Sequence, residues 1–229
     1  RQAARPVQES GRYEDEAEAE QEVTQVEPLY TEALSLRRAL LHDARLGNPL
    51  NTPAVHTLVS NFVESAIRNP DALMYFALIR GRDSVLAEHV LRCSLLALVV
   101  GRHMGLDRQA LNEIGIAALL HDVGKVRLPR EILHKTESLT DEERQLVERH
   151  VGWGAEILRA NPGISPRILE AVGQHHERYD GNGYPAGRRV IVNCAGNPAR
   201  QAITLNLPDS DGNHDGLFRF WRKVLDGLE

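Results

Sequence analysis

Residues that could hold a divalent metal ion are concentrated between His121 and Pro185. The stretch opens with the run His121-Asp122-Val123-Gly124-Lys125, passes through His150 and reaches the doublet His175-His176. Neutral imidazole and carboxylate are ligands that divalent cations prefer. Because these groups are spread over sequence typical of helices, we expect a metal cluster assembled from several helices.

The pair His121-Asp122 differs in its context from two other His-Asp pairs. His42-Asp43 and His214-Asp215 are not followed by Gly and Lys, and we interpret both as surface pairs. His121-Asp122 ends an apolar run, and it is followed by Gly124, which allows a sharp turn, and by Lys125. Such a pair can place two ligands on one metal ion, or its carboxylate can bridge two ions. A buried pair whose members bond only to each other is the alternative.

The elements that must position these groups are predicted to be helices. Apolar residues recur at intervals of three and four over residues 29–46 and 53–79, the second interrupted at Asn69-Pro70-Asp71 with Asp71 placed as a cap. A further helix over about residues 84–103 is rich in Leu and Val. Asp107 can cap the next helix, which runs into His121.

The second half of the site also follows helix signals. Thr140 and Glu143 have the spacing of a capping box, which predicts a helix that carries His150 and ends near Ala160. Ser165-Pro166 predicts the start of the helix that leads to His175 and His176. Alternating strand patterns are almost absent, although residues 190–192 could form a short strand or a loop. The sequence therefore predicts an all-α fold.

Size, charge and composition limit the possible functions. The 229 residues can bury a sizeable core, and the net charge of -5 gives no basic field for a nucleic acid polymer. Two cysteines argue against a disulfide framework. We expect no membrane span and no leader, hence a cytoplasmic location. The first residue is Arg1 rather than Met, as in a fragment.

The predicted domain organisation has two parts. Residues 1–50 form an acidic linker plus an N-terminal helix, with residues 1–28 interpreted as a solvated linker or helix because they are polar and rich in Glu. Residues 51–229 form the domain that carries the site.

Several motifs at fixed spacings together resemble those of the HD-GYP family, a branch of the HD phosphohydrolase superfamily. The matching text is LLHDVGK at 119–125, LTDEE at 139–143, His150, Gly154 and HHERYDGNGYP at 175–185. The resemblance covers about residues 70–187. It implies an HD-type helical bundle with a metal centre in its core.

The resemblance also implies a set of metal ligands and two or three metal ions, most commonly iron or manganese. Carried over by position, the ligands are His89, His121, Asp122, His150, His175 and His176, with Asp122 bridging. Some family members with three ions carry a Glu one helical turn before the first His. That position is Val85 here, so the resemblance favours two ions. His103 and His134 match no family ligand.

The remaining site residues follow from the same resemblance. Lys125 and Asp122 are the expected catalytic residues, with Lys125 stabilising charge on phosphate oxygens. Gly183, Tyr184 and Pro185 are expected to line the substrate pocket. Taken apart from the resemblance, the sequence of residues 180–183 predicts a simple turn.

The resemblance ends after Gly187. The family continues with a helix that supplies a further Asp ligand and with an Arg-Pro-Tyr-Arg segment that contacts substrate. Neither is found here; the expected Asp position falls near Thr204, and Asp209 or Asp211 could replace it only if the backbone shifted. The tail, residues 188–229, is either divergent or the product of a changed reading frame, and residues 216–228 have helical spacing.

The implied function is a bacterial signalling enzyme, a metal-dependent phosphodiesterase that hydrolyses cyclic di-GMP to pGpG and GMP. Two alternatives follow from the missing Asp and the altered tail. One is a catalytically impaired module that binds metal or nucleotide and signals through a partner protein or a homodimer. The other is an HD hydrolase of another phosphoester.

Overall fold

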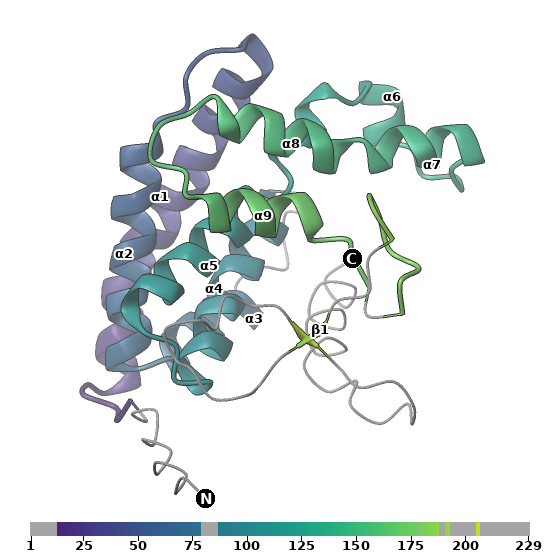
Figure 1. Cartoon of the computed structure of the whole chain (residues 1–229). Helices are drawn as coiled ribbons and strands as arrows, with labels where there is room; N and C mark the ends of the chain where they lie inside the picture. The colour runs from purple at the N-terminus through teal and green to yellow at the C-terminus, as the bar shows by residue number, and fades with distance from the viewer. Residues whose placement is uncertain (1–12, 79–86, 179, 188–190, 193–204, 207–229) are drawn as a thin grey trace, which may run out of the picture.

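The structure is a computed structural model that describes residues 13–78, 87–178 and 180–187, together with the backbone of 191–192 and 205–206 (Figure 1). Its helices are α1 (Ala19–Leu46), α2 (Thr52–Arg68), α3 (Asp71–Leu78), α4 (Ala87–His103), α5 (Arg108–Leu120), the 3-10 helix η1 (Val123–Arg127), α6 (Arg130–Leu133), α7 (Asp141–Glu148), α8 (His150–Arg159) and α9 (Pro166–Gln174). Two short strands, β1 (Ile191–Val192) and β2 (Leu205–Asn206), pair in antiparallel register. The predicted all-α class is confirmed, and the segment left open as strand or loop forms β1.

The helices pack in a bundle around α5. Helices α1 and α2 run side by side, and α5 packs against α2, α4 and α9 (Figure 1). Helix α8 packs against both α9 and η1. Fully buried apolar side chains join these elements into one core, among them Leu58, Phe62, Phe76, Leu95, Leu98, Leu111, Ile116, Leu158 and Ile168. Burial of this apolar surface fixes the ends of α5, α8 and α9, where the candidate ligands lie.

Helix α1 begins at Ala19, ten residues before the apolar pattern predicted. The reason is a buried acidic contact: Ser65 Oγ donates to Glu22 Oε2 over 2.7 Å, and Arg68 Nε donates to Glu22 Oε1 over 2.6 Å. Its side chains Val26 and Tyr30 join the same core as α2 and α3. The boundary predicted at residue 50 stays a prediction.

Removing the Glu22 carboxylate is expected to destabilise the fold. Glu22→Ala leaves the Ser65 hydroxyl and the Arg68 guanidinium without their partner, at a cost of about 2 kcal/mol in the free energy of unfolding. Urea unfolding of the metal-free chain measures this difference. Glu20→Ala, at an exposed position of the same helix, should change the value by less than about 0.5 kcal/mol. Equal effects of the two substitutions would show that the buried contact contributes nothing.

Most of the predicted helix caps are confirmed. The side chains of Asp107 and Ser165 each accept a backbone N–H three residues later, and Thr140 forms the full capping box with Glu143. The cap predicted at Asp71 is wrong, because the side chain of Asn69 accepts the Asp71 N–H instead.

The single helix predicted from Thr140 to Ala160 is also wrong. It divides into α7 and α8 at Arg149, immediately before His150. At this break the His150 ring donates through Nδ1 to the Val147 carbonyl. The break therefore places a ligand at the start of α8.

Other expectations fall on residues outside the described ranges. These are the start of α4 before Ala87, Val85, Thr204, Asp209, Asp211, the pair His214-Asp215 and the helix over residues 216–228. Within the described ranges His42 is exposed, which confirms its interpretation as a surface residue, and His103 and His134, which match no family ligand, are exposed as well.

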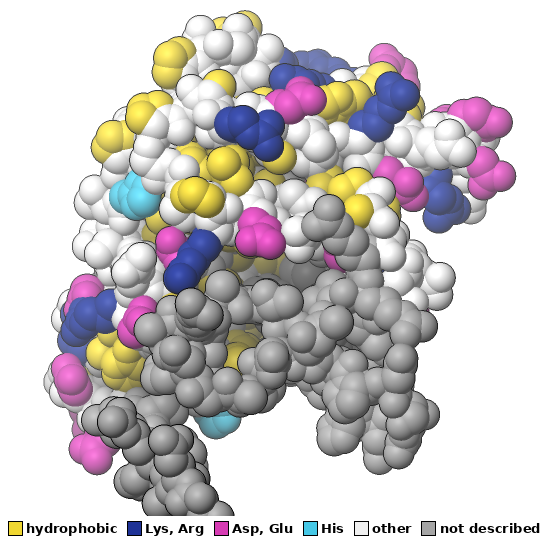
Figure 2. Space-filling view, in the orientation of Figure 1, with side chains coloured by type: hydrophobic (Ala, Val, Ile, Leu, Met, Phe, Trp, Pro, Cys, Tyr) yellow, Lys and Arg dark blue, Asp and Glu magenta, His cyan; other side chains and the backbone are white. Residues whose placement is uncertain are grey.

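Two features of the described residues concern membranes and surface charge. No helix in the described ranges is long and apolar enough to cross a membrane. On the face shown in Figure 2, basic and acidic side chains are interspersed rather than gathered into a basic patch.

Candidate metal centre

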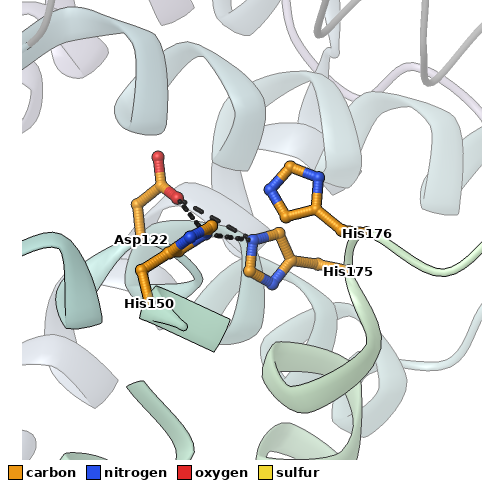
Figure 3. Close-up of side chains that lie close together, drawn as sticks. All are labelled: Asp122, His150, His175 and His176. Atoms are coloured by element: carbon orange, nitrogen blue, oxygen red, sulfur yellow. Dashed lines mark hydrogen bonds and ion pairs between the residues drawn. The ribbon is translucent and has the colours of Figure 1, made fainter. Parts of the chain in front are cut away.

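The centre is built around Asp122, which lies between the end of α5 and the start of η1. His121 is the C-cap of α5, and Asp122 precedes Val123 with only 8% of its surface exposed. His150 begins α8 and is fully buried, while His175 and His176 follow the end of α9. Three helix ends thus direct polar side chains towards one point (Figure 3).

Three of the histidines are oriented by the same backbone contact. In His121, His150 and His175 the ring Nδ1 lies 2.6 to 2.8 Å from the carbonyl oxygen three residues earlier. A carbonyl can only accept, so Nδ1 carries the proton and donates it. In a neutral ring this leaves the Nε2 lone pair free, and a hydrogen bond from the other ring nitrogen to a carbonyl is the arrangement common among metal-ligating histidines.

The two oxygens of Asp122 face different groups. Oδ2 accepts from Lys125 Nζ over 2.8 Å and lies 3.4 Å from His121 Nε2. Oδ1 lies 3.3 Å from His150 Nε2 and 3.8 Å from His175 Nε2. Candidate ligands therefore lie on both sides of this carboxylate.

Electrostatics keep these groups in the forms that bind cations. Burial acts to raise the pKa of Asp122, but the protonated forms of His121 and His150, together with the Lys125 ammonium, hold that pKa well below its ordinary value. Burial, reinforced by the charges of His121 and His176, lowers the pKa of His175 well below its usual range. Burial and His150 lower the pKa of His176 to about 4. The carboxylate is therefore ionised and these two imidazoles are neutral at pH 7.

The protein atoms alone leave this cluster without full hydrogen bonding. His150 Nε2 and His175 Nε2 are 3.2 Å apart, although both present lone pairs when their Nδ1 atoms hold the protons. Asp122 Oδ1 is buried and has no hydrogen-bond donor among the described residues. A cation would relieve the repulsion and satisfy the oxygen. The donor set therefore fits divalent metal ions.

Gly124 brings α8 against the His-Asp turn. A Cβ atom at this position would overlap the carbonyl oxygen of His150 and lie 2.5 Å from the nitrogen of Gly154. Its φ angle is not positive, so the interpretation as a sharp-turn glycine is wrong: the residue is small because two backbones meet here. This approach sets the spacing between Asp122 and His150.

The loop at residues 183–187 closes one side of the cluster. The Tyr184 ring stacks on the His176 ring with centroids 4.5 Å apart and an angle of 18° between them, and Tyr184 N donates to His176 O. A Cβ atom at Gly183 would lie 2.6 Å from Glu177 Cα, so only Gly allows this close return. Burial raises the pKa of Tyr184, which keeps its hydroxyl protonated.

The segment that contains the candidate ligands matches a known protein family. The family model described as HD domain matches residues 74–189, which is half of the chain and includes every candidate ligand. The chain belongs to the HD domain family.

Relatives of this HD domain include two bacterial phosphodiesterases. Cyclic di-GMP phosphodiesterase PA4108 of Pseudomonas aeruginosa is 33% identical over 168 residues, which cover 73% of this chain and 41% of that protein. The 3'3'-cGAMP-specific phosphodiesterase 2 of Vibrio cholerae is 36% identical over 108 residues, which cover 47% of this chain and 21% of that protein. The chain spans less than half the length of these relatives.

A solved structure shares the fold. The HD-GYP protein Bd1817 from Bdellovibrio bacteriovorus superposes with a TM-score of 0.60 at 20% identity, covering 73% of this chain and 54% of that one. With the family match and the relatives, this confirms the HD-GYP resemblance that the motifs predicted.

The HD domain brings the predicted ligands together to different degrees. Ligand atoms of Asp122, His150, His175 and His176 all lie within 4.8 Å of one another (Figure 3). His121 adjoins this group, with its ring centroid 4.9 Å from that of His175. His89 lies further out on α4, 6.4 Å from His121 between ring centroids.

Two neighbours of these predicted ligands were given no role from the sequence, although Glu177 lies within the motif at 175–185. Glu177 is buried and its Oε1 accepts the Ala186 N–H over 2.7 Å, which ties the loop to the ligand doublet. Cys93 is buried with its sulfur 3.6 Å from His89 Nε2. Glu177 directly follows His176, and Cys93 comes four residues, about one helical turn, after His89. This short spacing is the signal that could have identified them.

The histidine pKa values predict how the stability of the metal-free HD domain depends on pH. Because His176 has a folded pKa of about 4 against an ordinary 6.5, the unfolded chain binds a proton there first as the pH falls. Stability should therefore fall between pH 6.5 and 4, by up to about 3 kcal/mol from this residue. Urea unfolding at pH 7 and pH 4.5 measures the loss, which should be smaller in His176→Gln. The exposed His134→Gln should behave as the wild type, and an unchanged loss in His176→Gln would refute the assignment.

Proposed function

We propose that this chain is a metal-dependent phosphodiesterase that hydrolyses cyclic di-GMP, first to pGpG and then to GMP. The substrate class is supported by the relatives, whose names specify cyclic dinucleotides. The reaction class is supported by the cluster itself. The main support for this reaction class is the buried Asp122 Oδ1, which has no hydrogen-bond donor among the described residues and lies close to Nε2 of His150 and of His175.

The proposed centre holds two ions, with iron or manganese as the proposed metals. The ligands would be His89, His121, Asp122, His150, His175 and His176. His121 lies on the Oδ2 side of Asp122 and His150 on the Oδ1 side, which supports a bridging role for this carboxylate. Bound divalent ions would supply an acidified water and positive charge at the phosphate.

The protein side chains would orient the phosphodiester and balance its charge. Lys125 now donates to Asp122 Oδ2 and is one third exposed, so it can turn to a phosphate oxygen once the carboxylate is shared with cations. Tyr184 presents a protonated hydroxyl beside His176, and Gly183 lets the loop approach closely. Gly183, Tyr184 and Pro185 form the proposed substrate wall.

Purification of the chain under anaerobic conditions tests this function. We expect bound iron or manganese near two equivalents and conversion of cyclic di-GMP to pGpG and GMP, followed by chromatography of the products. Turnover should cease on chelation and return with Mn²⁺ or Fe²⁺. Metal-loaded protein with no turnover of any cyclic dinucleotide would instead favour the impaired signalling module.

A parallel assay with 3'3'-cGAMP separates the two substrate classes named among the relatives. A higher kcat/KM for 3'3'-cGAMP would replace cyclic di-GMP as the preferred substrate without changing the reaction class. The cytoplasmic location and the signalling partner or homodimer expected from the sequence stay predictions.

A further inference from the structure

Arg37 is a half-buried cation on α1 that the proposed mechanism does not use. It lies outside the segment 74–189 that matches the family model. Its guanidinium makes no hydrogen bond or ion pair with another residue in the described part of the chain. The neighbouring Arg38, in contrast, is exposed and donates to the Leu34 carbonyl over 3.2 Å.

Arg37 and Asp122 line the same small pocket. Its lining is mostly apolar and consists of Arg37, Leu40, Leu41, Val90, Leu119, Leu120, Asp122 and Val123. Asp122 belongs both to this pocket and to the cluster of ligands. Helix α1 also packs directly on η1, the element that carries Lys125. Arg37 therefore brings a positive charge from the N-terminal helix to the border of the site.

The surroundings of Arg37 make its charge costly. Burial lowers the pKa of its guanidinium, while the negative charge of Asp122 acts in the opposite direction. An arginine stays protonated in proteins even so. A half-buried charge among leucines, with no hydrogen-bonded partner among the described residues, is stabilised by water at its exposed part and by more distant charges. Cations bound to Asp122 would offset its negative charge and so weaken its attraction for the Arg37 guanidinium. A second anion near Arg37 would then be favoured.

We propose that Arg37 binds a non-bridging phosphate oxygen of the substrate, as a contact that α1 adds to the HD domain. The inference rests on the proposed function and deepens it. A guanidinium can hold two phosphate oxygens with its planar fork, whereas Lys125 offers a point charge.

Matched arginine substitutions on α1 test this role. Arg37→Met keeps a long apolar stem in the pocket, Arg37→Lys keeps the charge, and Arg38→Met is the exposed control. Each manganese-loaded protein is titrated with GMP and with inorganic phosphate, neither of which is a phosphodiester. We expect Arg37→Met to weaken both affinities and to raise KM for cyclic di-GMP at least tenfold, with metal content and Tm retained. Arg37→Lys should recover part of the loss, and Arg38→Met should match the wild type.

Other outcomes separate this inference from the proposed function. The role of Arg37 would be overturned if Arg37→Met kept the wild-type affinities for GMP and phosphate, or if it lost metal without a change in KM. It would also be overturned if the wild type bound neither GMP nor phosphate. A wild type that binds GMP through Arg37 but leaves cyclic di-GMP intact would overturn the proposed reaction alone.

Discussion

Asp122→Asn is expected to lower cyclic di-GMP turnover on the order of a thousandfold or more, together with the bound metal. The substitution keeps the shape of the side chain and removes the charge that faces His121 on one side and His150 on the other. A loss of this size corresponds to about 4 kcal/mol of transition-state stabilisation, which is within the range of metal-ion catalysis. Product chromatography and metal analysis of the same preparation measure both effects.

The same substitution should leave the metal-free fold intact. The new amide can donate to His150 Nε2, which now faces Asp122 Oδ1 with a lone pair at 3.3 Å. That donation offsets part of the stability lost with the Asp122 charge, whose depressed pKa shows that it stabilises the fold, so the metal-free variant should stay folded with a Tm somewhat below that of the wild type. A loss of activity through unfolding would instead abolish the cooperative unfolding transition.

Asp43→Asn provides a matched control, because His42-Asp43 is the other described His-Asp pair and its histidine is exposed. We expect wild-type turnover and metal content in this variant. If Asp122→Asn kept full turnover with a full complement of metal, Asp122 would have no place in the mechanism.

Local signals in the sequence predicted the parts of the site that lie within one element. The capping residues Asp107 and Ser165 start α5 and α9, and the apolar spacing of those helices carries the chain to Asp122 and His175. Cap and spacing act over one or two helical turns, so they can be read without knowledge of the fold. The ligand doublet was predictable for the same reason.

Features that depend on contacts between distant residues could not be predicted in this way. The early start of α1 depends on Glu22 meeting Ser65 and Arg68, more than forty residues away. The place of Arg37 at the site depends on α1 packing over η1. Periodicity identifies an apolar face, but it does not identify the helix that will cover it.

Gly124→Ala is expected to destabilise the fold by about 3 kcal/mol or more and to disrupt metal binding. The added methyl group would overlap the His150 carbonyl and press on the Gly154 nitrogen, and both are backbone atoms that cannot rotate away. This overlap can be relieved only if η1 and α8 move apart. The expected loss in the free energy of unfolding is therefore at the upper end of the range for overpacked cores. For a chain of this size the corresponding fall in Tm is about 6 to 12 °C.

Gly152→Ala is a control that separates the effect of the close contact at Gly124 from the general effect of replacing a helical glycine by alanine. Gly152 is exposed on α8, and a Cβ there meets nothing within 4 Å, so Gly152→Ala should stabilise the helix by about 0.5 to 1 kcal/mol. Calorimetry with and without Mn²⁺ compares the two variants. Because the contact of Gly124 with α8 sets the distance from Asp122 to His150, its substitution should also remove most of the thermal stabilisation that Mn²⁺ gives to the wild type. A Gly124→Ala protein that unfolds like the wild type and still gains stability from Mn²⁺ would show that this close approach does not position the ligands.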